Sequence, residues 1–330
     1  MRPLRVVPAG GAVAGTTVPL TPVQQEVLDE LGSTDRPRFR DDLRDHLTAE
    51  LDQSMQPLVD ALPAPPLIVT KHRLSLVHGC EHRYLAEQER PFAWNASAAR
   101  GVVAHKAIEL LVGWQATPTP LDLVEAAVAS LEHDEFASVR SYLVTLTMGQ
   151  RAELVAAAND KVAAFLETFP PLDRRWRPVT EARVRADLCD DRVRLQGKID
   201  LSLGYVRNGN EAGKVLIDLK TGAPQPAHVD DLRFYALLET LRGGIPPRLL
   251  VNYYLDAGRP RSETVTEDLL WSTAQRLVDG VRIIVELTTA AREPDRRPSW
   301  GCRWCPALED CEPGRRHLDP DGDVEDWRPG

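Results

Sequence analysis

Three charged side chains in the middle of the chain have the types and spacing of a metal site. Asp218 and Lys220 close an apolar run, KVLIDLK, and Asp200 lies in the alternating run before it, RLQGKIDLSLGY. Both runs have the composition of strands, and the Asn-Gly within the intervening RNGNEAG predicts a hairpin that brings the two aspartates together. Two carboxylates beside an ammonium can bind a hard divalent cation and a water that it activates.

A simpler interpretation is that Asp218 ends its strand and forms a surface salt bridge with Lys220. Such pairs are common and contribute little to stability. Here the aspartate lies within an apolar strand, where an unpaired carboxylate would be costly to bury, and Asp200 supplies a second acid. The context therefore favours a metal site over a surface ion pair.

The sequence GKID, followed by IDLKTG, resembles the active-site signature of the PD-(D/E)XK nuclease superfamily, specifically its RecB-like exonuclease branch. That branch reads G-x-x-D, then D/E-x-K-T-G, then a helix with Q-x-x-x-Y. Here the helix motif falls on DLRFY, with Asp231 in place of the glutamine and Tyr235 matched. The resemblance covers roughly residues 67–311. It implies an α/β fold: a restriction-endonuclease-like core whose mixed central sheet is flanked by helices.

The elements expected for this core run in the order strand, strand, strand, helix, strand. The first strand is TEARVRADL and the fourth is PRLLVNYYLD. Before the core, apolar residues at helical spacing predict an N-terminal helical extension up to the PAPP segment. We expect three parts: a flexible leader and helical extension over 1–66, the nuclease domain over 67–312, and a polar tail over 313–330.

The resemblance implies further site residues. His105, in ARGVVAHKAIELL, matches the G-x-x-x-H arrangement of the branch and would be a metal ligand, although a lone histidine on an apolar helix face more often packs. The carbonyl of Leu219 would complete the shell of Mg²⁺ or Mn²⁺, and imidazole suits Mn²⁺ better. Tyr235 would contact the DNA backbone or Lys220. Glu181, which opens the first core strand, is either an outer-shell acid or base or a solvated strand-start residue.

Four of the five cysteines could hold a second cofactor. Cys302, Cys305 and Cys311 form C-x2-C-x5-C, which in an intracellular chain indicates metal ligation before a disulfide. The resemblance implies Cys80 as the fourth ligand, because iron–sulfur members of the branch, including AddB-type helicase-nucleases and a CRISPR-adaptation nuclease, have one early and three late cysteines. We expect a [4Fe–4S] cluster that clips the end of the domain to its start, with zinc as the alternative. Cys189 has no partner at metal spacing and should be a buried thiol.

The composition and net charge of the chain exclude some classes of function. The 330-residue chain carries a net charge of −9, which argues against a protein that coats nucleic acid by electrostatics alone, but not against a nuclease whose metal neutralises its own acids. No apolar run reaches the roughly 18 residues of a transmembrane helix, so we expect a cytoplasmic protein without membrane contact.

These observations predict a metal-dependent DNA nuclease, a phosphodiester hydrolase. The resemblance favours an exonuclease acting on single-stranded or end-bearing DNA in repair, recombination or defence, with a helicase or another repair or defence protein as its candidate partner. Asp200 and Asp218 would hold the ion, and Lys220 would orient the attacking water. The alternative is a non-catalytic DNA-binding subunit of a helicase-nuclease complex. A restriction-type endonuclease ranks last, because the sequence contains no evident recognition helix.

Overall fold

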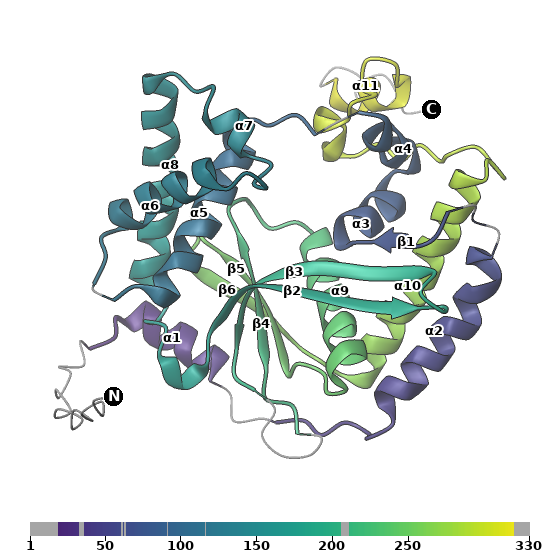
Figure 1. The fold of residues 1–330 in the computed structure, drawn as a ribbon, viewed down its shortest axis with the longest axis horizontal. Coiled ribbons are helices and arrows are strands. Elements are labelled where there is room, and N and C mark those ends of the chain that lie inside the picture. The colour runs from purple at the N-terminus through teal and green to yellow at the C-terminus, as the bar shows by residue number, and fades with distance from the viewer. Residues whose placement is uncertain are drawn as a thin grey trace, which may run out of the picture.

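A six-stranded mixed sheet lies at the centre of the protein (Figure 1). The computed structural model describes residues 19–32, 36–60, 62, 64–90, 92–115, 117–205 and 211–319. The strands are β1 (Leu67–Val69), β2 (Val179–Leu188), β3 (Val193–Leu203), β4 (Val215–Lys220), β5 (Leu249–Tyr254) and β6 (Arg259–Thr264). They are ordered β1-β3-β4-β5-β6, and β2 also pairs with β3. The pairs β1–β3 and β4–β5 are parallel, and the others are antiparallel.

One face of the sheet is covered by α2 (Leu43–Val59), α9 (Ala227–Gly243) and α10 (Glu267–Thr288). Apolar side chains recur along α2 at every fourth position, which places them on one face of the helix. These residues are fully buried: Leu43, Leu47, Leu51 and Met55. They pack in one core with Leu216 of β4 and Leu250 of β5.

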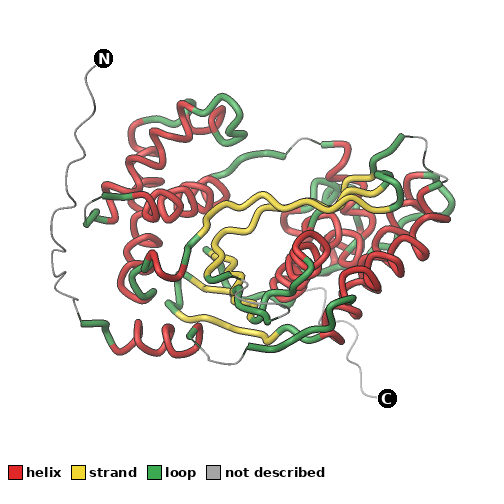
Figure 2. Tube along the Cα trace, turned by 60° about the horizontal axis from the view of Figure 1, so that its bottom comes forward, coloured by secondary structure: helices red, strands yellow, loops and turns green. Residues whose placement is uncertain are grey.

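The other face of the sheet packs against a helical layer, so helices lie on both sides of the strands (Figure 2). This layer contains α1 (Pro22–Leu31), α5 (Ala96–Gly113), α6 (Pro120–His133), α7 (Arg140–Leu143) and α8 (Met148–Thr168). Ile108 of α5 and Phe165 of α8 pack on Ile217 and Leu219, the β4 residues that alternate with those of the first face. The sheet is therefore buried on both sides, and the predicted α/β fold with a mixed sheet flanked by helices is confirmed.

A third group of short helices joins the beginning of the domain to its end. After β1 the chain forms α3 (Lys71–Gly79) and α4 (Glu81–Glu89), and the segment containing η2 (Trp300–Trp304) and α11 (Glu312–Leu318) returns beside them (Figure 1). Arg83 of α4 donates a hydrogen bond to the carbonyl of Gly301, 218 residues later. The remaining short element, η1 (Arg174–Trp176), precedes β2.

The sheet has two more strands than the sequence pattern indicated. Strand β1 has three residues, too few to show a period, and β6 (RPRSET) is a polar, mostly exposed strand at the edge of the sheet. Residues 1–18 of the predicted leader and the Asn-Gly turn fall outside the described residues, as does the tail from residue 320 onward. The preceding part of the expected tail contains α11. None of the described helices combines the length and apolar character needed to cross a membrane.

Candidate active site

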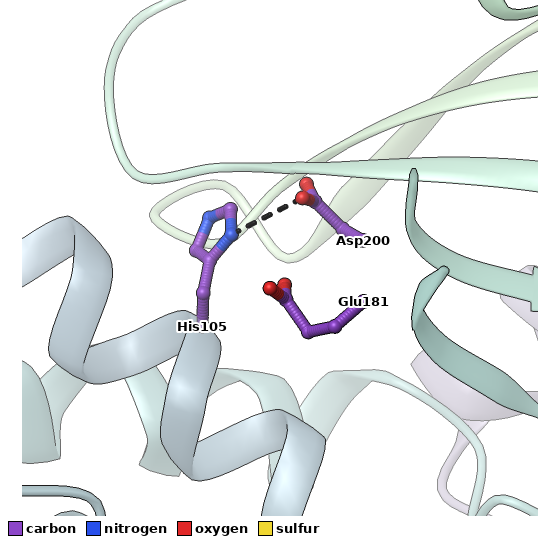
Figure 3. A group of neighbouring side chains, drawn as sticks. All are labelled: His105, Glu181 and Asp200. Carbon is purple, nitrogen blue, oxygen red and sulfur yellow. Dashed lines mark ion pairs between the residues drawn. The ribbon is translucent and has the colours of Figure 1, made fainter. Parts of the chain in front are cut away.

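Three side chains from three elements meet beside the sheet (Figure 3): His105 from α5, Glu181 from β2 and Asp200 from β3. One potential ligand atom from each lies within 4.8 Å of the other two. Nδ1 of His105 is 3.4 Å from Oδ1 of Asp200. Two carboxylates and an imidazole are a donor set that suits Mg²⁺ or Mn²⁺.

The backbone at Glu181 is strained. Its neighbours Thr180 and Ala182 pair with Leu201 and Ile199, so Glu181 lies across from Asp200, yet its φ is +54°. The left-handed region costs an L-residue about 1–2 kcal/mol, and such outliers cluster at functional sites. From the sequence, Glu181 was at most an outer-shell acid or base, because the residue pattern of a strand does not reveal the backbone angle of one residue.

The second part of the site is a buried carboxylate held by two lysines. The side chain of Asp218 is 4% exposed. Its Oδ1 accepts a hydrogen bond from Nζ of Lys71 at 2.8 Å. Its Oδ2 lies 2.6 Å from Nζ of Lys220, in an ion pair that lacks hydrogen-bond geometry. Because Asp218 is buried, the surface-ion-pair interpretation of this motif is wrong.

Lys71 is a site residue that the sequence analysis missed. Its ammonium also lies 3.6 Å from Oδ2 of Asp231, and Lys220 lies 3.2 Å from the same oxygen. Asp231, the residue that departs from the family motif, is therefore part of the charged site. A lysine 147 residues before Asp218 has no sequence signal that would link it to this position.

Charge and hydrogen bonding favour the ionised forms of Asp200 and Lys71. Burial acts to raise the pKa of Asp200, but His105, Lys71 and a hydrogen bond from the backbone outweigh it and lower the pKa to about 2. That bond is donated by the N–H of Leu219 at 2.8 Å. For Lys71, burial acts to lower the pKa, but the neighbouring carboxylates raise it above its usual range. The metal-ligand role expected for the Leu219 carbonyl stays a prediction.

Tyr235 of α9 lies behind the acids, buried against β3. Its hydroxyl accepts a hydrogen bond from the N–H of Lys198 at 3.4 Å, and its ring is 5.0 Å from Nζ of Lys71. A Cβ at Gly197 would collide with this ring, which explains the glycine of the G-x-x-D motif. Tyr235 is 3% exposed and lies against β3 and Lys71. Its expected contact with DNA or Lys220 stays a prediction.

The family model of the PD-(D/E)XK nuclease superfamily matches residues 69–312, which include every residue of the candidate site. The chain belongs to the PD-(D/E)XK nuclease superfamily. Among solved structures, a candidate exonuclease from Eubacterium rectale is 12% identical with a TM-score of 0.44, over 81% of this chain and 90% of that one. The protein SSO0001 is 15% identical with a TM-score of 0.33, over 82% of this chain and 97% of that one. A search of curated proteins finds no match.

As a PD-(D/E)XK nuclease, the chain is a phosphodiester hydrolase. Enzymes of this superfamily generally use Mg²⁺ or Mn²⁺, and the group of His105, Glu181 and Asp200 fits such an ion in both ligand type and spacing. Glu181 joins the group of side chains that could hold the ion, and the metal-ligand role expected for Asp218, which contacts two lysines, stays a prediction.

Four cysteines of this nuclease line one small pocket between α4, η2 and α11: Cys80, Cys302, Cys305 and Cys311. A Cβ at Gly314 would lie 3.4 Å from Sγ of Cys311 and 3.5 Å from Sγ of Cys302, so the helix approaches both sulfurs closely. Among the residues that the structure describes, no three of these sulfurs lie mutually within 4.8 Å. Tetrahedral zinc, with Zn–S of about 2.3 Å, would hold sulfurs about 3.8 Å apart.

The fifth cysteine, Cys189, belongs to the main core. It is 1% exposed, and burial raises the pKa of its thiol to about 12. Because the thiolate is the form that binds metals, this burial disfavours Cys189 as a ligand.

Proposed function

We propose that this nuclease is a metal-dependent DNA exonuclease that acts on single-stranded or end-bearing DNA. The observation that carries the proposal is the convergence of His105, Glu181 and Asp200 next to the buried pair of Asp218 and Lys220. The preference for exonuclease activity comes from the signature GKID…IDLKTG, which resembles the RecB-like branch. The intact acids and lysine disfavour a non-catalytic DNA-binding subunit.

Different residues of the site would bind the ion, orient the attacking water and stabilise the charge on the phosphate. A divalent ion at His105, Glu181 and Asp200 would polarise the phosphodiester and lower the pKa of a bound water. Lys220 would orient the attacking water and stabilise negative charge that develops on the phosphate. The N–H of Leu219 holds the Asp200 carboxylate in place, so the ligand is oriented before the ion arrives.

The proposal is tested by cleavage of end-labelled single-stranded DNA with Mn²⁺ or Mg²⁺, with a chelator as the control. Lys220→Gln should lower the turnover by about 10²–10³-fold or more, the scale of losing one electrostatic stabiliser of the transition state. Asp218→Asn should lower it on a similar scale, because it removes the carboxylate that holds Lys220 and that we expect to bind the ion. Asp279→Asn, on the exposed side of α10, should leave it unchanged. Near wild-type turnover in the two site variants, with contaminating nuclease excluded, would overturn the assignment.

The four-cysteine pocket supports a second part of the proposal, a structural [4Fe–4S] cluster. Its donor set of four thiols is the one such clusters take, and zinc is the alternative. The cluster would join α4 to the C-terminal segment. A helicase or another repair or defence protein is the partner that the RecB-like signature suggests, in a reducing compartment such as the cytoplasm.

A further inference from the structure

Two tryptophans of the short helix η2 lie on the surface of the protein. Trp300 is 70% exposed and Trp304 is 60% exposed. The guanidinium carbon of Arg303 lies over both rings, 4.9 Å from the ring centroid of Trp300 and 5.4 Å from that of Trp304. Cation–π contacts of this kind hold the two rings in place. Most of the surface of this tryptophan pair, Trp300 and Trp304, remains accessible to a partner.

The charge around the tryptophan pair is positive. Residues 296–308 contain three arginines and no acidic residue, although the whole chain has a net charge of −9. From the neighbouring helix, Arg83 donates a hydrogen bond to the carbonyl of Gly301, and Arg90 donates one to the carbonyl of Pro306. Exposed aromatic rings among arginines are the combination that binds single-stranded nucleic acid, because the bases stack on the rings and the cations attract the phosphates.

Another exposed aromatic ring of the described chain has the opposite surroundings. Phe136 is 96% exposed, but it follows Asp134 and Glu135, and its own N–H donates a hydrogen bond to Asp134. Carboxylates at this position repel a phosphate backbone. Exposure of an aromatic ring alone therefore does not indicate a DNA site, whereas exposure within a basic surface does.

Contacts between helices connect the tryptophan pair to the reaction centre. The first turn of α3 provides the lysine that contacts the buried aspartate of the candidate site, and it also contains Arg73. Arg73 donates a hydrogen bond at 2.6 Å to Gln88, near the end of α4. Arg90, two residues after Gln88, holds the carbonyl of Pro306, which is two residues after Trp304. Helix α4 lies between α3 and the segment that contains α11 (Figure 1).

We propose that the tryptophan pair is a base-stacking platform for single-stranded DNA, which binds the substrate strand at a distance from the scissile phosphate. The strand would run from the reaction centre along α4 to Trp300 and Trp304. Each base has a flat π-face, so such a platform needs unpaired bases but no particular sequence. That the bound strand is also the one cleaved rests on the proposed nuclease function, whereas the binding itself does not.

Binding of DNA without a divalent ion tests the platform separately from cleavage. The full-length protein is titrated into fluorescein-labelled oligo-dT about 20 nucleotides long, and the Kd is obtained from fluorescence anisotropy at one fixed salt concentration. Trp300→Ala and Trp304→Ala should each raise the Kd about 5–100-fold, the scale of one lost base–aromatic stack. Trp300→Phe and Trp304→Phe keep an aromatic ring and should raise it much less.

Two controls make the test specific. Phe136→Ala removes an exposed aromatic ring from the acidic surface and should leave the Kd unchanged. A blunt duplex of the same length contains no unpaired base, so the tryptophan variants should bind it with the affinity of the wild-type protein.

A change in the cysteine site must be separated from the loss of stacking, because Trp304 directly precedes Cys305. The metal content and thermal melt of each variant establish that the cysteine site and the fold are intact. If the alanine variants do not fold, photocrosslinking of the wild-type protein to oligo-dT that contains 5-iododeoxyuridine replaces them. The crosslink should then be found at Trp300 or Trp304, and crosslinks confined to other residues would contradict the proposal.

Two binding results would overturn the platform. One is folded Trp300→Ala and Trp304→Ala proteins that bind oligo-dT with wild-type affinity, which would leave the rings for a protein partner. The other is an equal loss of affinity for the duplex. A wild-type protein that binds oligo-dT through the two tryptophans and yet cleaves no DNA with Mn²⁺ would support the platform and refute the nuclease function. Cleavage with unchanged binding in both variants would refute the platform alone.

Discussion

At the scale of single residues, Glu181 shows how an unusual backbone angle can direct a side chain toward a metal site. A strand residue with φ of +54° is unusual, and here it lies across from Asp200 with its carboxylate in the metal-binding group. Its carboxylate also pairs with the exposed ammonium of Lys198, which holds the side chain in place. The fold sustains the strain because pairing continues on both sides of Glu181.

Two substitutions separate the strain from the ligand function. Both Glu181→Ala and Glu181→Gly remove the carboxylate and should weaken Mn²⁺ binding. Glycine has no left-handed penalty, so Glu181→Gly should be more stable than Glu181→Ala by about 0.5–1 kcal/mol, after its entropic cost is subtracted. Urea unfolding measures the difference. Arg183 is an exposed position of the same strand without a positive φ, so there the alanine variant should be more stable than the glycine variant. If the glycine variant is the more stable one at both positions, the backbone at Glu181 is not strained.

At the scale of elements, a buried ion pair joins α4 to the segment that follows α10. Glu81 is 1% exposed, and its carboxylate accepts hydrogen bonds from Arg292 at 2.6 and 2.9 Å and from the N–H of Asp295 at 2.9 Å. The hydrogen bonds from Arg292 lower the pKa of Glu81 below its usual value. This contact lies next to Cys80 and orients the chain that leads to the other cysteines.

Removing the charge of Glu81 should therefore loosen this junction. Glu81→Gln should lower the free energy of unfolding by about 1.5–3 kcal/mol at pH 7, the value of hydrogen bonds to a charged group. Because the folded pKa is depressed, the contribution is present above the unfolded pKa and is lost as the pH falls through the folded pKa. The free energies of unfolding of the wild-type protein and Glu81→Gln should therefore become equal in acid. Glu286→Gln, which removes a more exposed partner of Arg292, should cost less. Equal losses at pH 7 and in acid would contradict this account.

At the scale of the whole molecule, the four-cysteine pocket closes the domain on itself. Its residues come from the junction of α3 and α4 and from the last described segment of the chain. A bound cluster would add ligation free energy to contacts such as that between Arg83 and Gly301.

Cysteine variants test the cluster and the closure together. Protein purified without oxygen should be brown, with iron and sulfide bound, and Cys80→Ser should bleach it as fully as Cys305→Ser. Both variants should become sensitive to proteolysis after about residue 298, whereas Cys189→Ser, in the separate core, should keep its colour. Colourless wild-type protein with stoichiometric zinc would refute the cluster, and full iron content in Cys80→Ser would refute the closure.

Several features of this nuclease could be read from the sequence because they depend on local patterns. The alternating run before Asp200 and the apolar run around Asp218 specify two strands, and residues opposite each other on paired strands must meet. That Cys302, Cys305 and Cys311 cluster also follows from short spacing. The chemistry of paired acids with a lysine then indicates a metal-dependent hydrolase before any tertiary contact is known.

The tertiary structure decided which charges share the site. Lys71 reaches Asp218 only because a three-residue strand pairs with β3, and no periodicity reveals so short a strand. Glu181 enters the ligand group through a left-handed backbone angle that its residue type disfavours. Asp231 contacts Lys71 and Lys220 only when α9 packs against β4. These contacts join residues far apart in the chain, so their energies depend on packing that sequence spacing does not encode.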